Sequence, residues 1–148
     1  MSKKISEIMS CNIVTLKTDN TIRDAAKLML EEDIGFIPVS EDNSLVGVVT
    51  DRDLVIRGYA LGKSDQTKLE EVMTDYCISV ERDAYVDDVA EIMSEHKIRR
   101  VCVLDGDELV GICAIGDIAL ANGNKRDAGI ALSHISIPAN HGVFITNI

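Results

Sequence analysis

The stretch GVVTDRDL at residues 47–54 recurs as GICAIGDI at residues 111–118, and this recurrence determines the fold that we expect. A shift of 64 residues aligns 3–54 with 67–118 without a gap. Of the 52 aligned pairs, 14 are identical, against roughly 3 or 4 expected from ordinary composition. Self-similarity at a fixed period indicates two copies of one structural unit.

Each copy carries the same succession of expected elements. A short strand is expected at 13–16 and again at 77–80. Helical spacing of apolar residues predicts a helix at 21–32, where Thr21 and Asp24 have capping-box spacing, and the apolar face recurs at 86–93. A β-hairpin follows, with strands at 36–39 and 45–49 around a turn at 41–43, and in the second copy strands at 101–104 and 109–113 around a turn at 105–107. A second helix is expected to begin near Asp51, and its equivalent near Gly116.

These elements predict the α+β fold class, as tandem β-α-β-β-α units whose two helices cover one face of a small sheet. A unit of about 50 residues is too small to bury a good core alone, so we expect the two units to pack sheet against sheet. The first repeat is placed at 1–60, the second at 61–123 and a C-terminal extension at 124–148, together one module. Residues 57–66 are expected to connect the repeats, and 125–135 to form a helix before an irregular end.

The composition limits the classes of function. Apolar residues make up 46% of the 148 residues and aromatic residues 3%, so the core is expected to be aliphatic. The net charge is −10, and the clustered lysines and arginines that neutralise phosphates are missing. Nucleic acid and anionic membranes are therefore not expected as partners, and no apolar run reaches the about 18 residues of a membrane span.

The cysteines give no sign of a metal site. Residues 11, 77, 102 and 113 are cysteines, none in a Cys-x-x-Cys pair and none with a histidine at ligand spacing. The polar, charged start at 1–8 does not resemble a signal peptide. We therefore expect a cytoplasmic protein with reduced, buried cysteines and no required cofactor.

The two motifs resemble those of paired CBS domains, also called Bateman modules. GVVTDRDL has that family's pattern of glycine, two apolar residues, Thr or Ser, two variable residues and Asp, and GICAIGDI repeats it except at Ala114. The segments before the hairpins, IGFIPV at 34–39 and IRRVCV at 98–103, also fit, and the resemblance covers residues 5 to about 120. It implies a stand-alone pair of repeats about a pseudo-twofold axis, two clefts that hold adenosyl ligands, and a homodimer joined through the helices.

The resemblance also implies roles for individual residues. Asp53 and Asp117 would bind the ribose hydroxyls, and Thr50 would bind phosphate at a helix N-terminus, where free N–H groups favour anions. Arg99 and Arg100, on the strand before the hairpin, would reach phosphates. The first strand of each repeat would line the adenine pocket of the other repeat: Cys77, Ile78 and Ser79 at the Thr50/Asp53 cleft, and Ile13, Val14 and Thr15 at the Asp117 cleft.

Each assignment has a structural alternative. Thr50 and Asp53 also have the spacing of a helix cap, worth about 1 kcal/mol. The arginines would equally suit a surface where nearby acids pair with them, and the first-strand residues could be ordinary strand positions. The two clefts are expected to differ, since Ala114 lacks a hydroxyl, and Gly35 and Phe36 stand where the second repeat has its arginines.

Together these features predict a non-catalytic regulatory or sensor module that binds AMP, ADP, ATP, S-adenosylmethionine or NAD. A nucleophile–base pair and a Walker-type loop are missing, and the repeat uses almost the whole chain, so we do not expect an enzyme. The alternative is a structural or protein-interaction module without a bound ligand, which Gly35, Phe36 and Ala114 favour. The sequence identifies neither the ligand nor the target protein that would respond to it.

Overall fold

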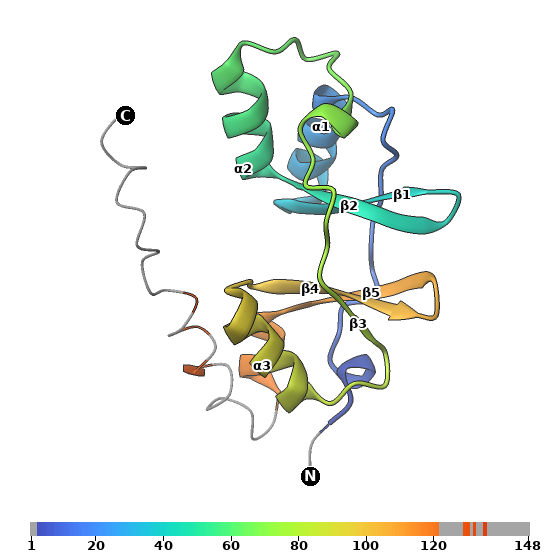
Figure 1. Cartoon of the computed structure of the whole chain (residues 1–148), viewed down its shortest axis with the longest axis vertical. Helices are drawn as coiled ribbons and strands as arrows, with labels where there is room; N and C mark the ends of the chain where they lie inside the picture. The colour runs from blue at the N-terminus through green and yellow to red at the C-terminus, as the bar shows by residue number, and fades with distance from the viewer. Residues whose placement is uncertain (1–2, 122–128, 131, 133–134, 136–148) are drawn as a thin grey trace.

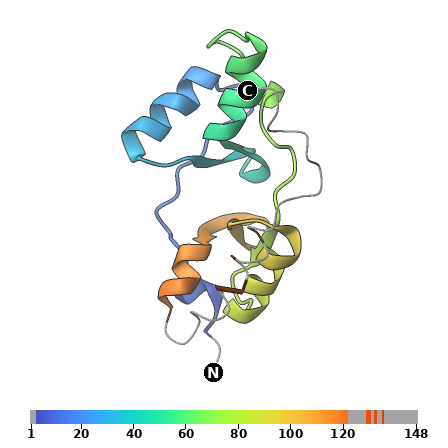
Figure 2. The same cartoon turned by 90° about the vertical axis from the view of Figure 1, so that its left-hand side faces the viewer.

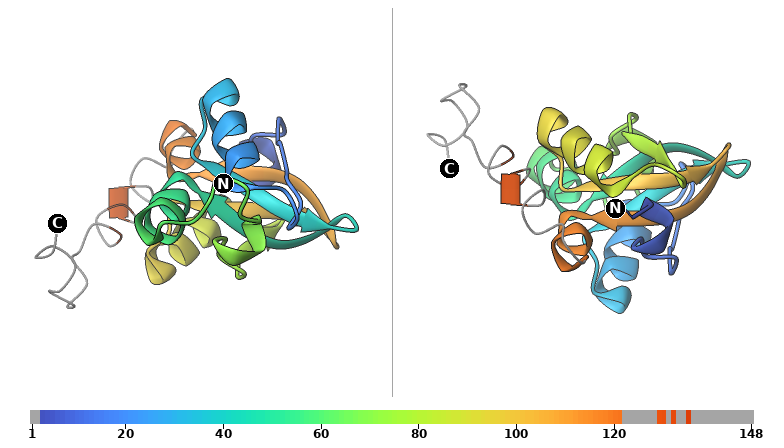
Figure 3. Two further views of the ribbon diagram at one scale, coloured as in Figure 1. Left: turned by 90° about the horizontal axis from the view of Figure 1, so that it is seen from above. Right: turned by 90° about the horizontal axis from the view of Figure 1, so that it is seen from below.

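The computed structural model describes residues 3–121, 129–130, 132 and 135. Two units are stacked along the long axis, with their sheets facing each other and the helices on the outer sides (Figure 1). Seen along that axis, the two hairpins extend in the same direction (Figure 3). The elements are α1 (Ile22–Glu32), β1 (Phe36–Glu41), β2 (Ser44–Thr50), α2 (Asp51–Asp53), β3 (Ser79–Glu81), α3 (Val86–His96), β4 (Arg100–Asp105), β5 (Glu108–Ala114) and α4 (Ile115–Leu120). The expected α+β class is confirmed.

The two units repeat each other element by element. The helices and strands α1, β1, β2 and α2 have their counterparts in α3, β4, β5 and α4, and each counterpart begins 64 residues later. Both long helices end on a residue in the left-handed conformation, Asp33 and Lys97, each with φ 54°. β1 and β2 form one antiparallel sheet, while β3 adds a parallel strand to the antiparallel pair of β4 and β5. The period of the sequence is therefore the period of the structure.

Local sequence signals explain where α1 begins and where the first hairpin turns. Thr21 caps α1 as expected, because its Oγ1 accepts from the Asp24 N–H at 3.1 Å and Asp24 Oδ2 accepts from the Thr21 N–H at 2.9 Å. The turn between β1 and β2 consists of Asp42 and Asn43, with φ 48° and 65°. Tight hairpin turns require such values, which Asp and Asn tolerate better than other side chains.

Each unit has an aliphatic core between its sheet and its helices. The core of the second unit includes Ile5, from the start of the chain, packed with Val80 and Val86. The core of the first unit includes Leu69 and Val72, from the start of the second repeat. The segment that begins each repeat therefore packs into the opposite unit, and this exchange of segments ties the two units together.

The glycine that opens each octapeptide motif lets this exchanged segment approach. Val48 and Thr74 exchange two backbone hydrogen bonds, of 2.9 Å and 2.8 Å. A Cβ on Gly47 would collide with the backbone oxygen of Thr74. The bridge between Ser10 and Ile112 repeats the contact in the other unit. The motif glycine thus has a structural role, which is to admit a neighbouring backbone.

The predicted first strands are partly wrong. Residues 13–16 do not form a strand, and only Leu16 makes a bridge, with Val39 of β1. β3 begins at Ser79 rather than at residue 77. Both segments cross from one unit to the other (Figure 2), and a crossing chain reaches its neighbouring strand only at its far end.

The predicted connector at 57–66 is also partly wrong, because the chain stays helical beyond residue 57. α2 continues as a π-helix, Leu54–Gly58, and a 3₁₀ turn, Tyr59–Leu61. Gly58 is buried against α1, and a Cβ at this position would lie only 2.9 Å from Ile22 Cδ1. The predicted helix at 125–135 and the irregular end lie largely outside the described residues. Among the described helices, none has the length and apolar composition of a membrane span.

Candidate functional site

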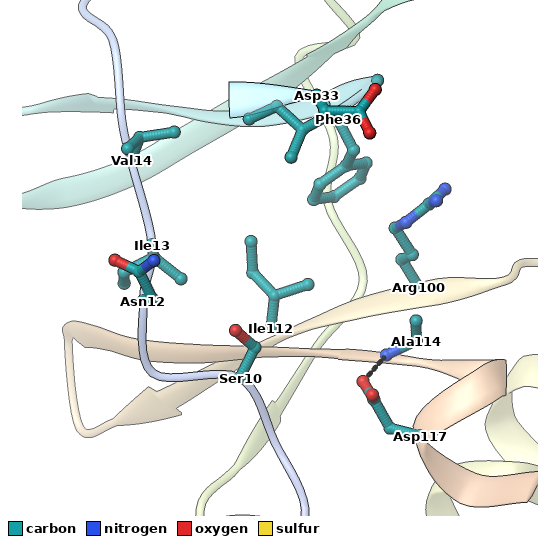
Figure 4. Close-up of a pocket in the computed structure, with 12 residues that line it drawn as sticks. Ser10, Asn12, Ile13, Val14, Asp33, Phe36, Arg100, Ile112, Ala114 and Asp117 are labelled. Carbon is teal, nitrogen blue, oxygen red and sulfur yellow. Dashed lines mark hydrogen bonds between the residues drawn. The ribbon is translucent and has the colours of Figure 1, made fainter. Parts of the chain in front are cut away.

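A cavity of about 260 Å³ lies between the two units, beside the start of α4. The first repeat contributes residues 12–14 of the crossing segment and residues 33–36, between α1 and β1. The second repeat contributes Arg100 of β4, Ile112 and Ala114 of β5, and Asp117 of α4 (Figure 4). The cavity therefore exists only because the two repeats face each other.

Asp117 presents a carboxylate to this cavity. Its Oδ2 accepts a hydrogen bond from the Ala114 N–H at 2.8 Å, as the third residue of a capped helix does. Its Oδ1 has no hydrogen-bond partner among the described residues. The side chain is half-buried, so one carboxylate oxygen is available to a donor that enters the cavity.

Arg100 and Phe36 meet at the rim of the cavity. The guanidinium carbon of Arg100 lies 5.9 Å from the centre of the Phe36 ring, within the range of a cation–π interaction. The two positions are 64 residues apart and begin β4 and β1, so the pseudo-twofold arrangement brings equivalent positions together. The ring holds the guanidinium beside the cavity.

Most of the remaining lining is apolar, apart from one further charge and the polar side chains of Ser10 and Asn12. Ile13, Val14, Ile34 and Ile112 supply aliphatic surface from both repeats. Asp33, the left-handed residue that ends α1, adds a second carboxylate. The described lining therefore has more negative than positive side-chain charge, in a pocket that could hold a flat apolar group.

Thr50 and Asp53 occupy the equivalent position in the first repeat and cap each other. Asp53 N donates to Thr50 Oγ1 at 3.1 Å, and Thr50 N donates to Asp53 Oδ2 at 3.0 Å. Asp53 Oδ1 also lies 3.9 Å from Nε of Arg57. Thr50 and Asp53 therefore form the helix cap that was the structural alternative for this pair. Their role in ligand binding stays a prediction.

The other predicted site residues are spread over several places. Thr15 lies in a different cavity, with residues of the two hairpin turns. Cys77 and Ser79 line a third cavity with 44–47, at the opposite end of β2 from Thr50. Ile78 packs against the core of the second unit. Arg99 is exposed, and its backbone oxygen accepts from Ile115 N at 2.8 Å. Of the predicted set, the structure brings Ile13, Val14, Arg100 and Asp117 together around this cavity.

The lining also includes residues that were not among the predicted contacts, and the polar ones among them are Ser10, Asn12 and Asp33. Asp33 could have been found from the alignment of the repeats, since it precedes the segment 34–39 that matches a motif and ends the helix before it. Ser10 and Asn12 belong to the exchanged segment, whose place depends on the opposite unit, and no local pattern identifies them.

The fold and the cavity between its halves define a tandem-repeat α+β module with a site shared by both repeats. The chain belongs to the CBS domain family, whose sequence model matches residues 5–58 and again 69–123. The CBS domain-containing protein YhcV of Bacillus subtilis is 37% identical over 132 residues, which cover 89% of this chain and 94% of that protein. Pairs of CBS domains are generally regulatory modules.

Solved structures share the fold. The hexameric CBS-CP12 protein from bloom-forming cyanobacteria has a TM-score of 0.74 and 31% identity, over 85% of this chain and 75% of that one. Hypoxic Response Protein I, solved with two coordinated zinc ions, has a TM-score of 0.71 and 34% identity, over 79% of this chain and 97% of that one. Within the described part of this chain, no group of three or more His, Cys, Asp or Glu side chains is placed to hold a metal.

Proposed function

We propose that this protein is a non-catalytic regulatory module that binds an adenosyl ligand in the cavity between its repeats. The proposal rests on the Asp117 carboxylate, which faces the cavity between apolar walls from both repeats. Ribose hydroxyls donate hydrogen bonds that a carboxylate accepts, and apolar side chains cover the faces of a base. Sites for drug-sized ligands measure about 300–1,000 Å³, so in this smaller cavity we place only the base and the ribose.

The charges around the cavity favour a ligand without a phosphate chain at this position. Asp33 and Asp117 outnumber Arg100, whose guanidinium already contacts the ring of Phe36. Two carboxylates repel a phosphate most strongly where water is partly excluded. We therefore rank adenosine and S-adenosylmethionine, which has cationic sulfonium and ammonium groups, ahead of AMP, ADP, ATP and NAD for this cavity.

The position related to this cavity by the 64-residue shift has the opposite charge pattern. Lys97, Arg99 and the hydroxyl of Thr50 stand where the cavity has residues 33, 35 and 114. Phosphate oxygens accept hydrogen bonds from cationic side chains and from hydroxyl groups. We propose that the phosphates of AMP, ADP or ATP bind on the Thr50 side, together with Asp53, rather than beside Asp117.

Calorimetric titration and thermal unfolding with adenosine, S-adenosylmethionine, AMP and ATP test the proposed function. A ligand present at 100 times its Kd adds about 2.7 kcal/mol to the folded state, and each kcal/mol moves the midpoint by roughly 2–4 °C at this chain length, so a rise of about 5–10 °C is expected. Asp117→Asn, which keeps an oxygen for the helix cap, should weaken adenosine binding about 10-fold. Asp87→Asn, on the exposed side of α3, is the matched control and should bind normally.

A chain that shows no shift with any adenine compound at millimolar concentration would support the alternative function, a protein-interaction module without a ligand. An effect of Asp87→Asn equal to that of Asp117→Asn would instead show that the cavity has been misplaced.

Self-association is a second proposed property, because apolar side chains are exposed on the helical side of the first unit. Leu30 of α1 is 82% exposed, and Tyr59 and Leu61 beyond α2 are 86% and 69% exposed. Exposed apolar patches mark interaction sites, and closed twofold symmetry is the common solution. We propose a homodimer through these helices.

Light scattering that gives the mass of a single chain at micromolar concentration would overturn the proposed homodimer, and Tyr59→Lys should weaken the dimer. A cytoplasmic location and a separate target protein stay predictions.

A further inference from the structure

Two of the cysteines meet on one face of the second sheet. Sγ of Cys77 lies 3.2 Å from Sγ of Cys102. Cys102 lies on β4 two residues after Arg100, and alternate residues of a strand share a face. The residues that alternate with it, Val101 and Val103, pack into the core on the other face. The sulfur pair therefore lies on the side of β4 that carries the rim of the ligand cavity.

The two thiols differ in access. Cys77 is half-buried and lines a cavity of about 210 Å³ that reaches Tyr76 and Ser79. Cys102 is fully buried. A small reagent in the cavity therefore reaches the Cys77 sulfur first and meets Cys102 only behind it.

The contact also makes Cys77 the more reactive thiol. When Cys77 is ionised, the Cys102 thiol is the donor of the pair, and this hydrogen bond holds the pKa of Cys77 below its usual value. The same hydrogen bond, and then burial, raise the pKa of Cys102. A thiolate is the nucleophile in cysteine oxidation, so Cys77 should react first and Cys102 second.

The other two cysteines are separate from this pair. Cys113 lies on β5 and packs in the core of the second unit. Burial, and then the charge of Asp117, raise the pKa of Cys113 to about 12. Cys11 is exposed on the crossing segment. Neither sulfur is placed to compete for Cys102.

We propose that Cys77 and Cys102 are a redox site that a hydroperoxide converts reversibly into a disulfide. The Cys77 thiolate attacks a peroxide oxygen, the O–O bond breaks, and the leaving hydroxide takes up a proton to give water. The sulfenic acid so formed on Cys77 is attacked by the Cys102 sulfur. The S–O bond breaks, and the proton of Cys102 leaves with the hydroxide as a second water. The two thiols lose two electrons, and hydrogen peroxide gains them.

The structure requires little movement for this reaction. A disulfide has an S–S distance of about 2.05 Å, so the sulfurs must approach by roughly 1 Å. The bond would tie the segment that crosses between the units to β4, immediately before the start of β3. Disulfides in reducing compartments are usually transient and redox-sensing, which suits a pair with one accessible member.

The test uses the full chain with Cys11→Ser, which removes the exposed thiol. The protein is treated with hydrogen peroxide in slight excess, blocked with N-ethylmaleimide while unfolded, and weighed by intact mass spectrometry. We expect a mass loss of two hydrogen atoms, one thiol left to alkylate instead of three, a cross-linked peptide that joins residues 77 and 102, and full reversal by dithiothreitol. Three thiols still free, a bridge to Cys113, or sulfinic acid at Cys77 as the main product would overturn the proposal.

Two single variants give the matched controls. Cys77→Ser should leave Cys102 and Cys113 reduced under the same treatment. Cys102→Ala should stop the reaction at a sulfenic acid on Cys77 that dimedone traps. Oxidation of Cys102 in Cys77→Ser at the wild-type rate would contradict the assigned order of attack. The peptide map of the Cys11→Ser chain decides the proposal even where Cys102→Ala folds poorly.

Discussion

Gly47→Ala tests whether the exchanged segments hold the two units together. The added Cβ would collide with the backbone oxygen of Thr74, and residue 74 belongs to the exchanged segment at the start of the second repeat. Moving it away breaks the two hydrogen bonds of 2.9 Å and 2.8 Å with Val48. Each such bond contributes about 0.5–1.5 kcal/mol net, and the loss of chain entropy in the unfolded state returns about 0.4–1 kcal/mol. The expected net loss is about 1–2 kcal/mol from these two effects, and crowding adds to it.

The assay is thermal unfolding of the purified chain, followed by circular dichroism. A loss of this size lowers the midpoint by roughly 2–8 °C at this chain length. Gly116→Ala is the matched control, because a Cβ there meets nothing within 4 Å, and the change removes a helical glycine, which should stabilise by up to about 1 kcal/mol. A Gly47→Ala chain that unfolds at the wild-type temperature would refute the close backbone approach.

Three further predictions concern single residues. Gly111→Ala should cost less than Gly47→Ala in the same unfolding assay, because its Cβ meets chiefly the flexible side chain of Met9; an equal or larger loss would contradict this. Arg100→Ala should leave the binding of S-adenosylmethionine in calorimetry unchanged or stronger, because it removes positive charge from the rim of the Asp117 cavity; weaker binding of this cationic ligand would count against the charge argument. Hydrogen bonds from the backbone of Thr21, and then from a neighbouring asparagine amide, hold the pKa of Asp24 below its usual value. A carboxyl whose pKa is lowered in the folded state stabilises the fold at pH values above the ordinary carboxyl pKa, and this stabilisation is lost as the pH falls through the lowered pKa. The stability advantage of wild type over Asp24→Asn should therefore shrink below about pH 4.

Features set by neighbouring residues could be predicted from the sequence. The cap of α1 by Thr21 and the hairpin turn at 41–43 depend on residues a few positions apart, and both were found where expected. The period of 64 also has a local basis, because each copy repeats the same spacing of apolar and turn residues. These features fixed the fold class and the order of its elements.

Features that depend on the opposite unit could not be predicted. Ile5 and Leu69 have the same place in their repeats, but nothing near either residue shows that it packs into the other unit. Dependence on the opposite unit also explains why the first strands are shorter than predicted, because residues 13–16 and 77–78 belong to segments that cross between the units. At the site, Arg100 and Asp117 were predicted and both line the cavity, while Ser10 and Asn12 were missed because their place depends on the opposite unit.

The most direct test of the proposed function is to locate a bound ligand on the protein by ¹H–¹⁵N NMR, with adenosine added to the labelled chain. If adenosine binds between the repeats, the largest shift changes will come from the amides of Gly35, Ala114 and Asp117, which lie on opposite walls of the cavity. Asp87, on the outer face of α3, should keep its position in the spectrum. Spectra that stay unchanged at millimolar adenosine, S-adenosylmethionine and ATP, or changes centred on the outer helices, would contradict the account.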